Sequence, residues 1–305
     1  MGSGMWSDSA FRSYSCSRGY KVNKSGAIDG NYNNQEMFKS TNLVPELDPK
    51  NVIRECCDSE EHPNVVPVIL ALDVTGSMGM AAVEVAKKLN VVMTELYNNV
   101  ADVEFMIMGI GDMACDSSPA QASQFESDIR IADQLEKIYF EFGGGGNGFE
   151  SYTLPWYFAL NHTKIDAIEK RNKKGIIITM GDEPLNPYLP KSGRYASFES
   201  VFGDIIEEDI DTKALYDMVK NKFEIFHIHV DHSRTSRFYS FENCGPTFSK
   251  VIGEDHVINA TLDNIADNII SIVSNYANKD TNSNDSIVIK DTNDVIKNEN
   301  GDISW

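Results

Sequence analysis

The chain has 305 residues, and its 46 acidic residues outnumber its 27 basic ones to give a formal net charge of −19. This excess of negative charge excludes a broad basic surface of the kind that binds nucleic acid phosphates, so we expect no nucleic acid partner. Apolar residues make up 41% of the chain, and with the glycines they reach roughly the 45–50% that is typical of globular proteins. The composition therefore predicts that most of the chain folds around a sizeable core.

The cysteines and the first residues predict a cytoplasmic protein. The five cysteines are odd in number, include the adjacent pair Cys56 and Cys57, and show no Cys-x-x-Cys spacing, so we expect reduced thiols. The start of the chain lacks the apolar core of a signal peptide, and no window approaches the ~18 apolar residues of a membrane span. We therefore expect neither secretion nor insertion into a membrane.

Composition and the pattern of apolar residues divide the chain into three parts. Residues 1–63 are rich in Asn, Ser, Gly and charge, without a sustained apolar period, and predict an extended N-terminal arm. Met37, Phe38, Leu43, Val44 and Leu47 could dock some of this arm on a sheet edge or a helix face. Residues 64–278 predict one folded domain with an acidic insertion at 112–136. Residues 279–305 are rich in Asn, Asp and Lys and predict a disordered tail.

Within the predicted domain, short apolar runs alternate with segments that have helical spacing. The runs predict strands at Val65–Leu72, Val103–Ile110, Ile138–Phe142, Gly175–Met180, Phe223–Val230 and His256–Ala260. The periodic segments predict helices at Ala81–Tyr97, Ser151–Ile168, Phe198–Lys220 and Leu262–Tyr276. This alternation predicts an α/β fold, with a doubly wound, mostly parallel central sheet flanked by helices.

Oxygen-bearing side chains follow several of the predicted strands. The loop Asp73-Val74-Thr75-Gly76-Ser77 follows the first strand, residues 147–153 follow the third, and Asp182-Glu183 follow the fourth. Ligands of open α/β sheets bind outside the carboxyl ends of the strands, and carboxylate and hydroxyl oxygens suit Mg²⁺ or Mn²⁺. These loops therefore predict a cation site, although the same residue types at a strand-to-helix junction are also ordinary helix caps.

The string Asp73-x-Thr75-x-Ser77 after a buried strand resembles the metal-ion-dependent adhesion site of von Willebrand factor type A domains, whose motif is Asp-x-Ser/Thr-x-Ser. The resemblance covers roughly residues 64–278 and implies that domain's three-layer, Rossmann-like sandwich. It further implies a hydroxyl ligand from a middle loop, for which Ser151 is our choice, with Thr153 and Glu150 as alternatives, and an Asp at the end of a later strand, here Asp182. The combined motifs look most like uncharacterised bacterial and phage members.

The same resemblance implies a protein-interaction module in which a partner completes the coordination of the cation, commonly through an acidic side chain. Of the five residues that it assigns to the metal, only Asp73 and Asp182 are charged. These two carboxylates balance the charge of a dication, which can still attract a further carboxylate from a partner. The resemblance therefore favours a protein that binds a cation and recruits a partner over an enzyme.

Enzyme interpretations start from Ser77 or Asp73. Ser77 could be the nucleophile of a serine hydrolase, with Asp182 and one of His227, His229 or His232 following in the chain order of such triads. The Gly that normally precedes the nucleophile by two residues is replaced by a Thr, and only one convincing strand comes before Ser77. A phosphatase that uses Asp73 as nucleophile is a second alternative, weakened because Thr75 stands where a second acid is needed.

Two further patterns predict binding sites with less support. The alternating histidines of residues 227–229, with His232, could chelate zinc, but polar neighbours on a strand give the same pattern. The spacing Gly143-x-Gly145-x-x-Gly148, with Asp166 downstream, matches a dinucleotide fingerprint. In a run of four glycines this match arises easily, and Asp166 does not follow a second strand as the fingerprint requires.

Overall fold

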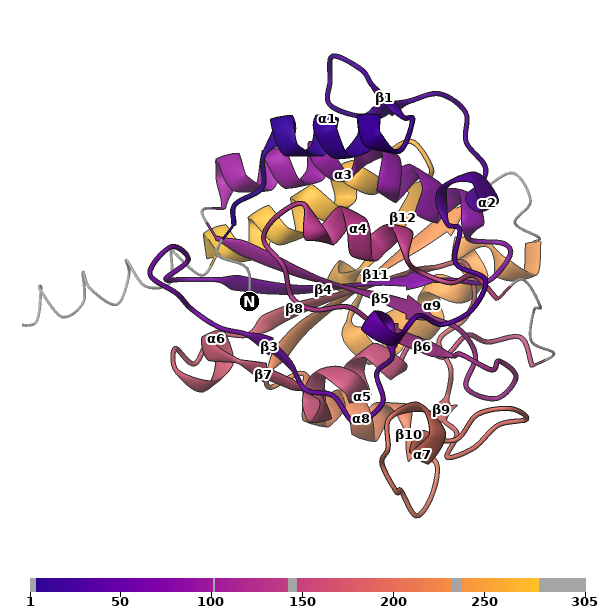
Figure 1. Ribbon diagram of the computed structural model, residues 1–305. Coiled ribbons are helices and arrows are strands. Elements are labelled where there is room, and N and C mark those ends of the chain that lie inside the picture. The colour runs from indigo at the N-terminus through magenta and orange to yellow at the C-terminus, as the bar shows by residue number, and fades with distance from the viewer. Residues whose placement is uncertain (1–3, 101, 142–146, 232–236, 280–305) are drawn as a thin grey trace, which may run out of the picture.

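The computed structural model describes residues 4–100, 102–141, 147–231 and 237–279. Its centre is a six-stranded sheet in the order β12-β11-β8-β4-β5-β6 (Figure 1). The strands are β4 (Val66–Asp73), β5 (Val103–Ile110), β6 (Ala120–Ala122), β8 (Gly175–Gly181), β11 (Phe223–Asp231) and β12 (Val257–Thr261). Every neighbouring pair is parallel except β5 and β6. The chain enters at β4, moves outward to β6, and then crosses to β8 and moves outward the other way, which confirms the doubly wound α/β prediction.

Helices cover both faces of the sheet (Figure 1). One face packs against α3 (Gly79–Asn99), α4 (Arg130–Glu136) and a C-terminal helix of residues 265–279, and α1 (Asp8–Ser17) lies on the outer side of α3. The other face packs against α5 (Leu154–Asn161), α8 (Thr212–Val219) and α9 (Phe241–Ile252). Along β4, Leu70 and Leu72 belong to the first core, and Ile69 and Ala71 belong to the second. Burial on both faces explains why β4 reads as a continuous apolar run.

The N-terminal segment differs from the predicted extended arm. It contains α1, the hairpin of β1 (Lys21–Val22) and β2 (Ile28–Asp29), α2 (Asn34–Met37), the 3₁₀ turn η1 (Pro45–Leu47) and β3 (Arg54–Cys56). Trp6 is buried and its Nε1 donates to Oδ1 of Asn90 on α3 at 2.9 Å, while the Asn90 amide donates to the carbonyl of Gly26 at 3.1 Å. The segment folds because this long-range packing supplies partners that no local period reveals.

The third strand of the sheet is not the predicted Ile138–Phe142. Residues 138–141 form no strand, and Phe142 lies outside the described residues. The sheet edge is instead β6, within the predicted insertion, and its Gln121 side chain donates to the Tyr139 carbonyl at 2.7 Å and accepts from the Tyr139 amide at 2.9 Å. The Gln121 side chain thus takes the place of a neighbouring strand's backbone. Ile138 and Phe140 are buried, but their segment pairs with no strand.

Two predicted helices are shorter in the structure. Residues 151–168 contain α5, then β7 (Thr163–Ile165), which pairs with β3, and α6 (Asp166–Glu169). Residues 198–220 contain α7 (Phe198–Val201) and α8, separated by β10 (Ile210–Asp211), which pairs with β9 (Tyr188–Leu189). Gly203 has a φ of +87°, which favours glycine and ends the helical turn. The Asp204 carboxylate then joins the segment after α7 to α5 and its C-cap: it accepts from the Tyr157 hydroxyl and lies 2.6 Å from His162 Nε2.

The last helix of the predicted domain is present in the structure, with different bounds. The predicted helix at Leu262–Tyr276 is found at residues 265–279, and the predicted tail lies outside the described residues apart from Lys279. Two elements precede it, η2 (Arg237–Tyr239) and η3 (Glu254–His256), on either side of α9. In the described ranges, no helix combines the length and the apolar character needed to cross a membrane.

We expect Phe11→Ala to lower the free energy of unfolding by about 3–5 kcal/mol, because truncating a buried Phe leaves a cavity. Phe11 is 1% exposed in the core beneath α1, whereas Phe238 is 83% exposed. The matched substitution Phe238→Ala should therefore change stability by less than about 0.5 kcal/mol. Urea denaturation of both variants gives the comparison. If Phe11→Ala lowers the free energy of unfolding as little as Phe238→Ala does, the N-terminal layer does not contribute to the stability of the fold.

Candidate metal centre

Asp73 ends β4, and its carboxylate organises the loop that leads into α3. Asp73 Oδ1 accepts hydrogen bonds from the Thr75 backbone N–H at 2.8 Å and from the Thr75 hydroxyl at 2.5 Å. This local turn brings Thr75 Oγ1 to 3.3 Å from Ser77 Oγ. The alternate spacing of the three residues thus places their oxygens on one side of the loop, as the sequence predicts.

Asp182 joins this group from the neighbouring strand. It follows Gly181, the last residue of β8, and β8 pairs with β4 in parallel, so the two loops leave the sheet at the same edge. Ser77 Oγ donates to Asp182 Oδ1 at 3.1 Å. Asp73, Thr75 and Asp182 are 1%, 6% and 4% exposed, whereas Ser77 is exposed. The structure therefore brings four of the five predicted residues together between β4 and β8, where the winding of the sheet reverses and ligands bind.

Tyr152 is a member of this group that the sequence analysis did not select. Its hydroxyl donates to Asp73 Oδ2 at 2.8 Å and accepts from the Glu183 backbone N–H at 3.2 Å. The ring lies against Gly181, where a Cβ would overlap the tyrosine hydroxyl. Tyr152 is fully buried, so it fixes the Asp73 carboxylate relative to the β8 loop. The glycine at the end of β8 is the one local signal that a large side chain crosses there.

The middle loop places its three candidate residues differently. Ser151 Oγ accepts from the Met113 backbone N–H at 2.9 Å and donates to Asp112 Oδ1 at 3.3 Å. The Thr153 hydroxyl accepts from the Asn186 amide at 2.6 Å. Glu150 is 3% exposed and its Oε2 has no hydrogen-bond partner. Ser151 as the hydroxyl ligand therefore stays a prediction, with its oxygen directed to the loop after β5.

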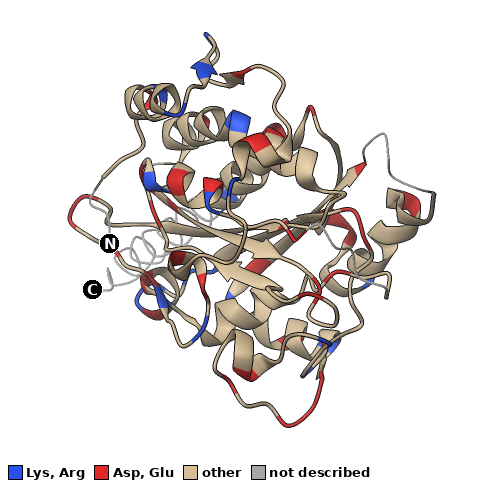
Figure 2. Cartoon of the chain, turned by 45° about the vertical axis from the view of Figure 1, so that its right-hand side comes forward, with Lys and Arg blue, Asp and Glu red and all other residues tan. Residues whose placement is uncertain are grey.

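Acidic residues of the neighbouring loops influence this group, and Figure 2 colours the Asp and Glu positions of the chain red. Burial, and then the charge of Asp182, raise the pKa of Asp73 to about 7. Burial, followed by Asp182 and Asp112, raises the pKa of Glu183 to about 7. Burial, and then Asp73 and Glu183, raise the pKa of Glu150 to about 11. These carboxyls keep their protons to higher pH than usual, because burial and mutual repulsion penalise their ionised forms.

The donor set fits a hard dication. Two buried carboxylate oxygens, Glu150 Oε2 and Asp112 Oδ2, have no hydrogen-bond partner, and a cation would compensate the repulsion among the carboxylates. In the part of the chain that the structure describes, no three His, Cys, Asp or Glu side chains converge closely enough to hold a metal ion. A cation here would therefore use hydroxyl oxygens and water beside its carboxylates, as Mg²⁺ commonly does.

The described histidines of β11 have partners of their own. His227 is fully buried, its Nδ1 lies 2.9 Å from the Thr179 hydroxyl, and its ring stacks on Phe248. His229 Nε2 lies 3.1 Å from the Tyr239 carbonyl. Burial lowers the pKa of His227 well below the usual range of histidine. Ser77 bonds to Thr75 and Asp182, so the described contacts form no Ser–His pair, and His232 lies outside the described residues.

The glycine-rich pattern gives no cofactor site within the described residues. Gly143 and Gly145 lie outside them, and Gly148 has a φ of +76°, which favours glycine in the turn before Glu150. Asp166, which the fingerprint would direct at a ribose, is buried and accepts from the Asp58 backbone N–H at 3.0 Å and from Lys170 Nζ at 2.7 Å. Its carboxylate therefore anchors α6.

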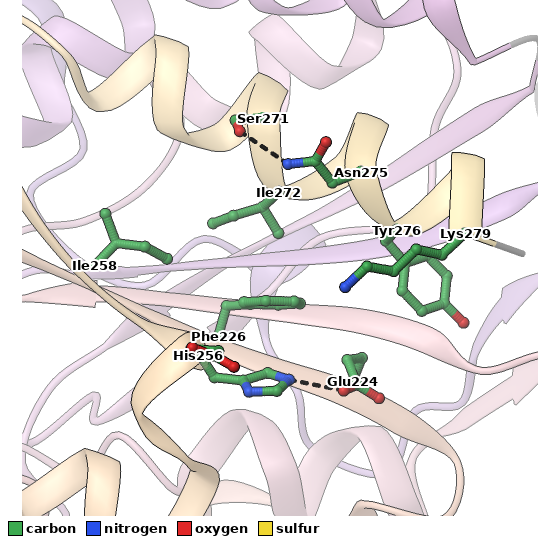
Figure 3. A pocket seen from close by; sticks show the side chains of 10 residues that line it. Glu224, Phe226, His256, Ile258, Ser271, Ile272, Asn275, Tyr276 and Lys279 are labelled. Carbon is green, nitrogen blue, oxygen red and sulfur yellow. Dashed lines mark hydrogen bonds and ion pairs between the residues drawn. The ribbon is translucent and has the colours of Figure 1, made fainter.

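A cavity of about 520 Å³ lies away from the strand-end loops, at the amino ends of β11 and β12 and beside the C-terminal helix (Figure 3). Phe226 of β11 and His256 of η3 line it on one side, and Ile272 and Asn275 of the C-terminal helix line it on the other. Glu224 lies 2.7 Å from His256 Nε2 and accepts from Lys174 at 3.1 Å, and the His256 contact is the main cause that lowers its pKa to about 2. This carboxylate is thus engaged within the protein.

No family model matches the chain, and no curated protein matches it. Solved structures similar to it include the pilus adhesin SpaC from Lactobacillus rhamnosus GG, with 14% identity and a TM-score of 0.47 over 75% of this chain and 31% of SpaC. Proximal thread matrix protein 1 from the mussel byssus has 11% identity and a TM-score of 0.45 over 69% of this chain and 46% of that protein. The chain thus spans less than half of either protein. The vWF domain of the type V pili tip protein Mfa5 from Porphyromonas gingivalis has 14% identity and a TM-score of 0.43, over 70% of this chain and 95% of that domain.

Proposed function

We propose that the protein is a metal-dependent protein-interaction module. Asp73, Thr75, Ser77 and Asp182 hold Mg²⁺, or Mn²⁺, directly or through water, and Ser151 or a neighbour in the middle loop completes the site. The observation that carries this proposal is the direct contact of the β4 and β8 loops through Ser77 and Asp182 at 3.1 Å. Their oxygens are hard ligands, and they lie where ligands bind in doubly wound sheets.

The exposure of the site residues supports recruitment of a partner. Asp73 and Asp182 are almost fully buried, and Ser77 is exposed, so the group is open to solvent on the Ser77 side. A bound dication supplies positive charge at this opening. We propose that a partner protein approaches there with an acidic side chain, because Asp73 and Asp182 alone balance a dication and leave it able to accept a further carboxylate.

A serine hydrolase fits the described contacts less well. A nucleophilic serine needs a general base within hydrogen-bond reach, whereas Ser77 donates to a carboxylate, and both described histidines of β11 have other partners. The unoccupied hydrogen-bonding capacity of the carboxylates at the same edge instead favours a cation.

The proposal is tested by capturing partner proteins on the immobilised full chain in the presence of Mg²⁺. We expect a partner that is retained with Mg²⁺, released by a chelator, and not retained by the double variant Asp73→Ala/Asp182→Ala. Circular dichroism and urea denaturation of the double variant establish that it is folded. Undiminished capture of the same partner by the folded double variant, or capture that persists in chelator, would contradict a role for the metal.

A further inference from the structure

The cavity of about 520 Å³ beside the C-terminal helix has an apolar interior (Figure 3). The side chains of Phe226, Ile258, Ile272 and Tyr276 line it. Ile272 is buried, whereas the other three are half-buried. The volume lies within the range of about 300–1,000 Å³ that is typical of ligand pockets. The cavity therefore presents apolar surface that a further group can cover.

The described part of the chain ends at this cavity. Lys279, the last described residue, lines the cavity, and its side chain reaches over it from the end of the helix (Figure 3). The sequence continues with residues 280–305, which lie outside the described residues. Residues 280–286 are all polar, and the apolar run Ile287-Val288-Ile289 follows them directly. An apolar segment of the chain thus begins a short distance along the sequence from an apolar cavity.

The linker between the two is long enough for the run to return to the cavity. Ile287 comes eight residues after Lys279, and eight extended residues span up to about 26–29 Å. Closing a loop of this length costs little more entropy than closing a shorter one. A short flexible tether also gives an effective concentration in the millimolar range, so contacts that are weak between separate molecules suffice within one chain.

The charges at the cavity favour the tail over a second copy of the chain. Glu224, Asp255 and Lys279 place both signs of charge among the lining residues, and Asp285 and Lys290 flank the apolar run with both signs as well. The segment can therefore bring each of its charges close to an opposite one. Two whole chains, each with a formal net charge of −19, repel each other.

A direct continuation of the sheet does not account for the apolar run. β12 lies at the edge of the sheet, and β11 is its neighbour there. The connections outward from β8 to β11 and β12 pass over the face of α8 and α9, whereas the C-terminal helix lies on the opposite face with α3 (Figure 1). A further parallel strand beside β12, reached through this helix, would make a left-handed crossover, which is rare. The cavity is the alternative place for the run.

We propose that the run Ile287-Val288-Ile289 docks in the cavity between the C-terminal helix and the amino ends of β11 and β12, so that the tail folds back on its own domain. The β-branched side chains of the run cover Phe226 and Ile258, and the polar residues 280–286 form the connecting loop. This inference is independent of the proposed metal centre, which lies at the opposite ends of the strands.

Photocrosslinking of the dilute full chain tests this docking. The photoreactive residue p-benzoylphenylalanine is placed at position 288, and in a control protein at position 300, farther along the tail. We expect position 288 to crosslink within one chain to residues that line the cavity. Ile258→Asp, which puts a charge into the cavity, should lower the yield at least about fivefold, because burying a charge against apolar groups is costly. Ile205→Asp is the matched control, since Ile205 is 83% exposed in another loop, and it should leave the yield unchanged.

Mass spectrometry locates the crosslinks, and circular dichroism establishes that each variant is folded. Should Ile258→Asp not fold, Asn275→Trp fills the cavity from an exposed position on the helix and should lower the yield in the same way. Crosslinks from position 288 that map outside the cavity, or that reach it no more often than those from position 300, would overturn the proposal. An unchanged yield in the folded cavity variant would overturn it as well. Crosslinks between two chains would show that the cavity takes the tail of a second copy, and they would overturn the assignment to the chain's own tail.

Discussion

Asp73→Asn is expected to abolish the stabilisation of the protein by Mg²⁺ without unfolding it. A cation that binds only the native state stabilises it by about 2.7 kcal/mol at a concentration one hundred times its Kd, and the wild type should show this gain. The variant loses the carboxylate that organises Thr75 and accepts from Tyr152, so it should show no gain. Its stability without cation should equal or exceed that of the wild type, because a buried carboxylate next to Asp182 is removed.

Urea denaturation with and without Mg²⁺ measures both effects. Asp217→Asn is the matched control, because Asp217 pairs with Lys213 and Lys220 on the exposed side of α8, away from the strand ends. This control should keep the full Mg²⁺ gain. An Asp73→Asn protein that Mg²⁺ stabilises as much as it stabilises the control would contradict the assignment of Asp73.

The second large effect is on pH dependence. The pKa of Asp73 rises from 3.8 to about 7 in the folded protein, so the folded state holds this proton more tightly than the unfolded state does. The resulting contribution to stability is fully present below the unfolded pKa, near 4, and is lost as the pH rises through about 7. About three pKa units at 1.36 kcal/mol each set an upper bound of about 4 kcal/mol for this loss.

The difference in the free energy of unfolding between Asp73→Asn and the wild type isolates this term. Buried His227 and His229 have lowered pKa values, so their contribution changes in the opposite direction below the usual pKa of histidine, but it is common to both proteins. Without cation, the variant should gain stability relative to the wild type between pH ~4 and ~8. A flat difference, or one of opposite sign, would show that Asp73 is not held protonated by burial.

The sequence predicts the central strands well because their environment is uniform. β4, β5, β8 and β11 are covered on both faces, and such strands read as continuous apolar runs. The edge strand β6 has three residues, and it was not predicted because its position depends on contacts with distant segments. The same holds for the N-terminal layer, where Trp6 packs against α3 through a hydrogen bond that spans 84 residues of sequence.

The candidate site divides in the same way. Asp73, Thr75 and Ser77 could be selected from local spacing, and Asp182 from its place after a buried strand, because parallel strands end at a common edge. The sequence does not show how Tyr152 and Glu150 lie relative to the site. Tyr152 reaches Asp73 only because Gly181 leaves room for its ring. Glu150 Oε2 is buried without a hydrogen-bond partner, which depends on how the loops fold.

The most direct test of the central claim is calorimetric titration of Mg²⁺ and Mn²⁺ into the full chain, beside Asp73→Ala/Asp182→Ala shown to be folded. We predict saturable binding of one cation per chain to the wild type and none to the double variant. Binding of equal affinity to both proteins, or no binding to the wild type, would contradict a metal centre at the ends of β4 and β8.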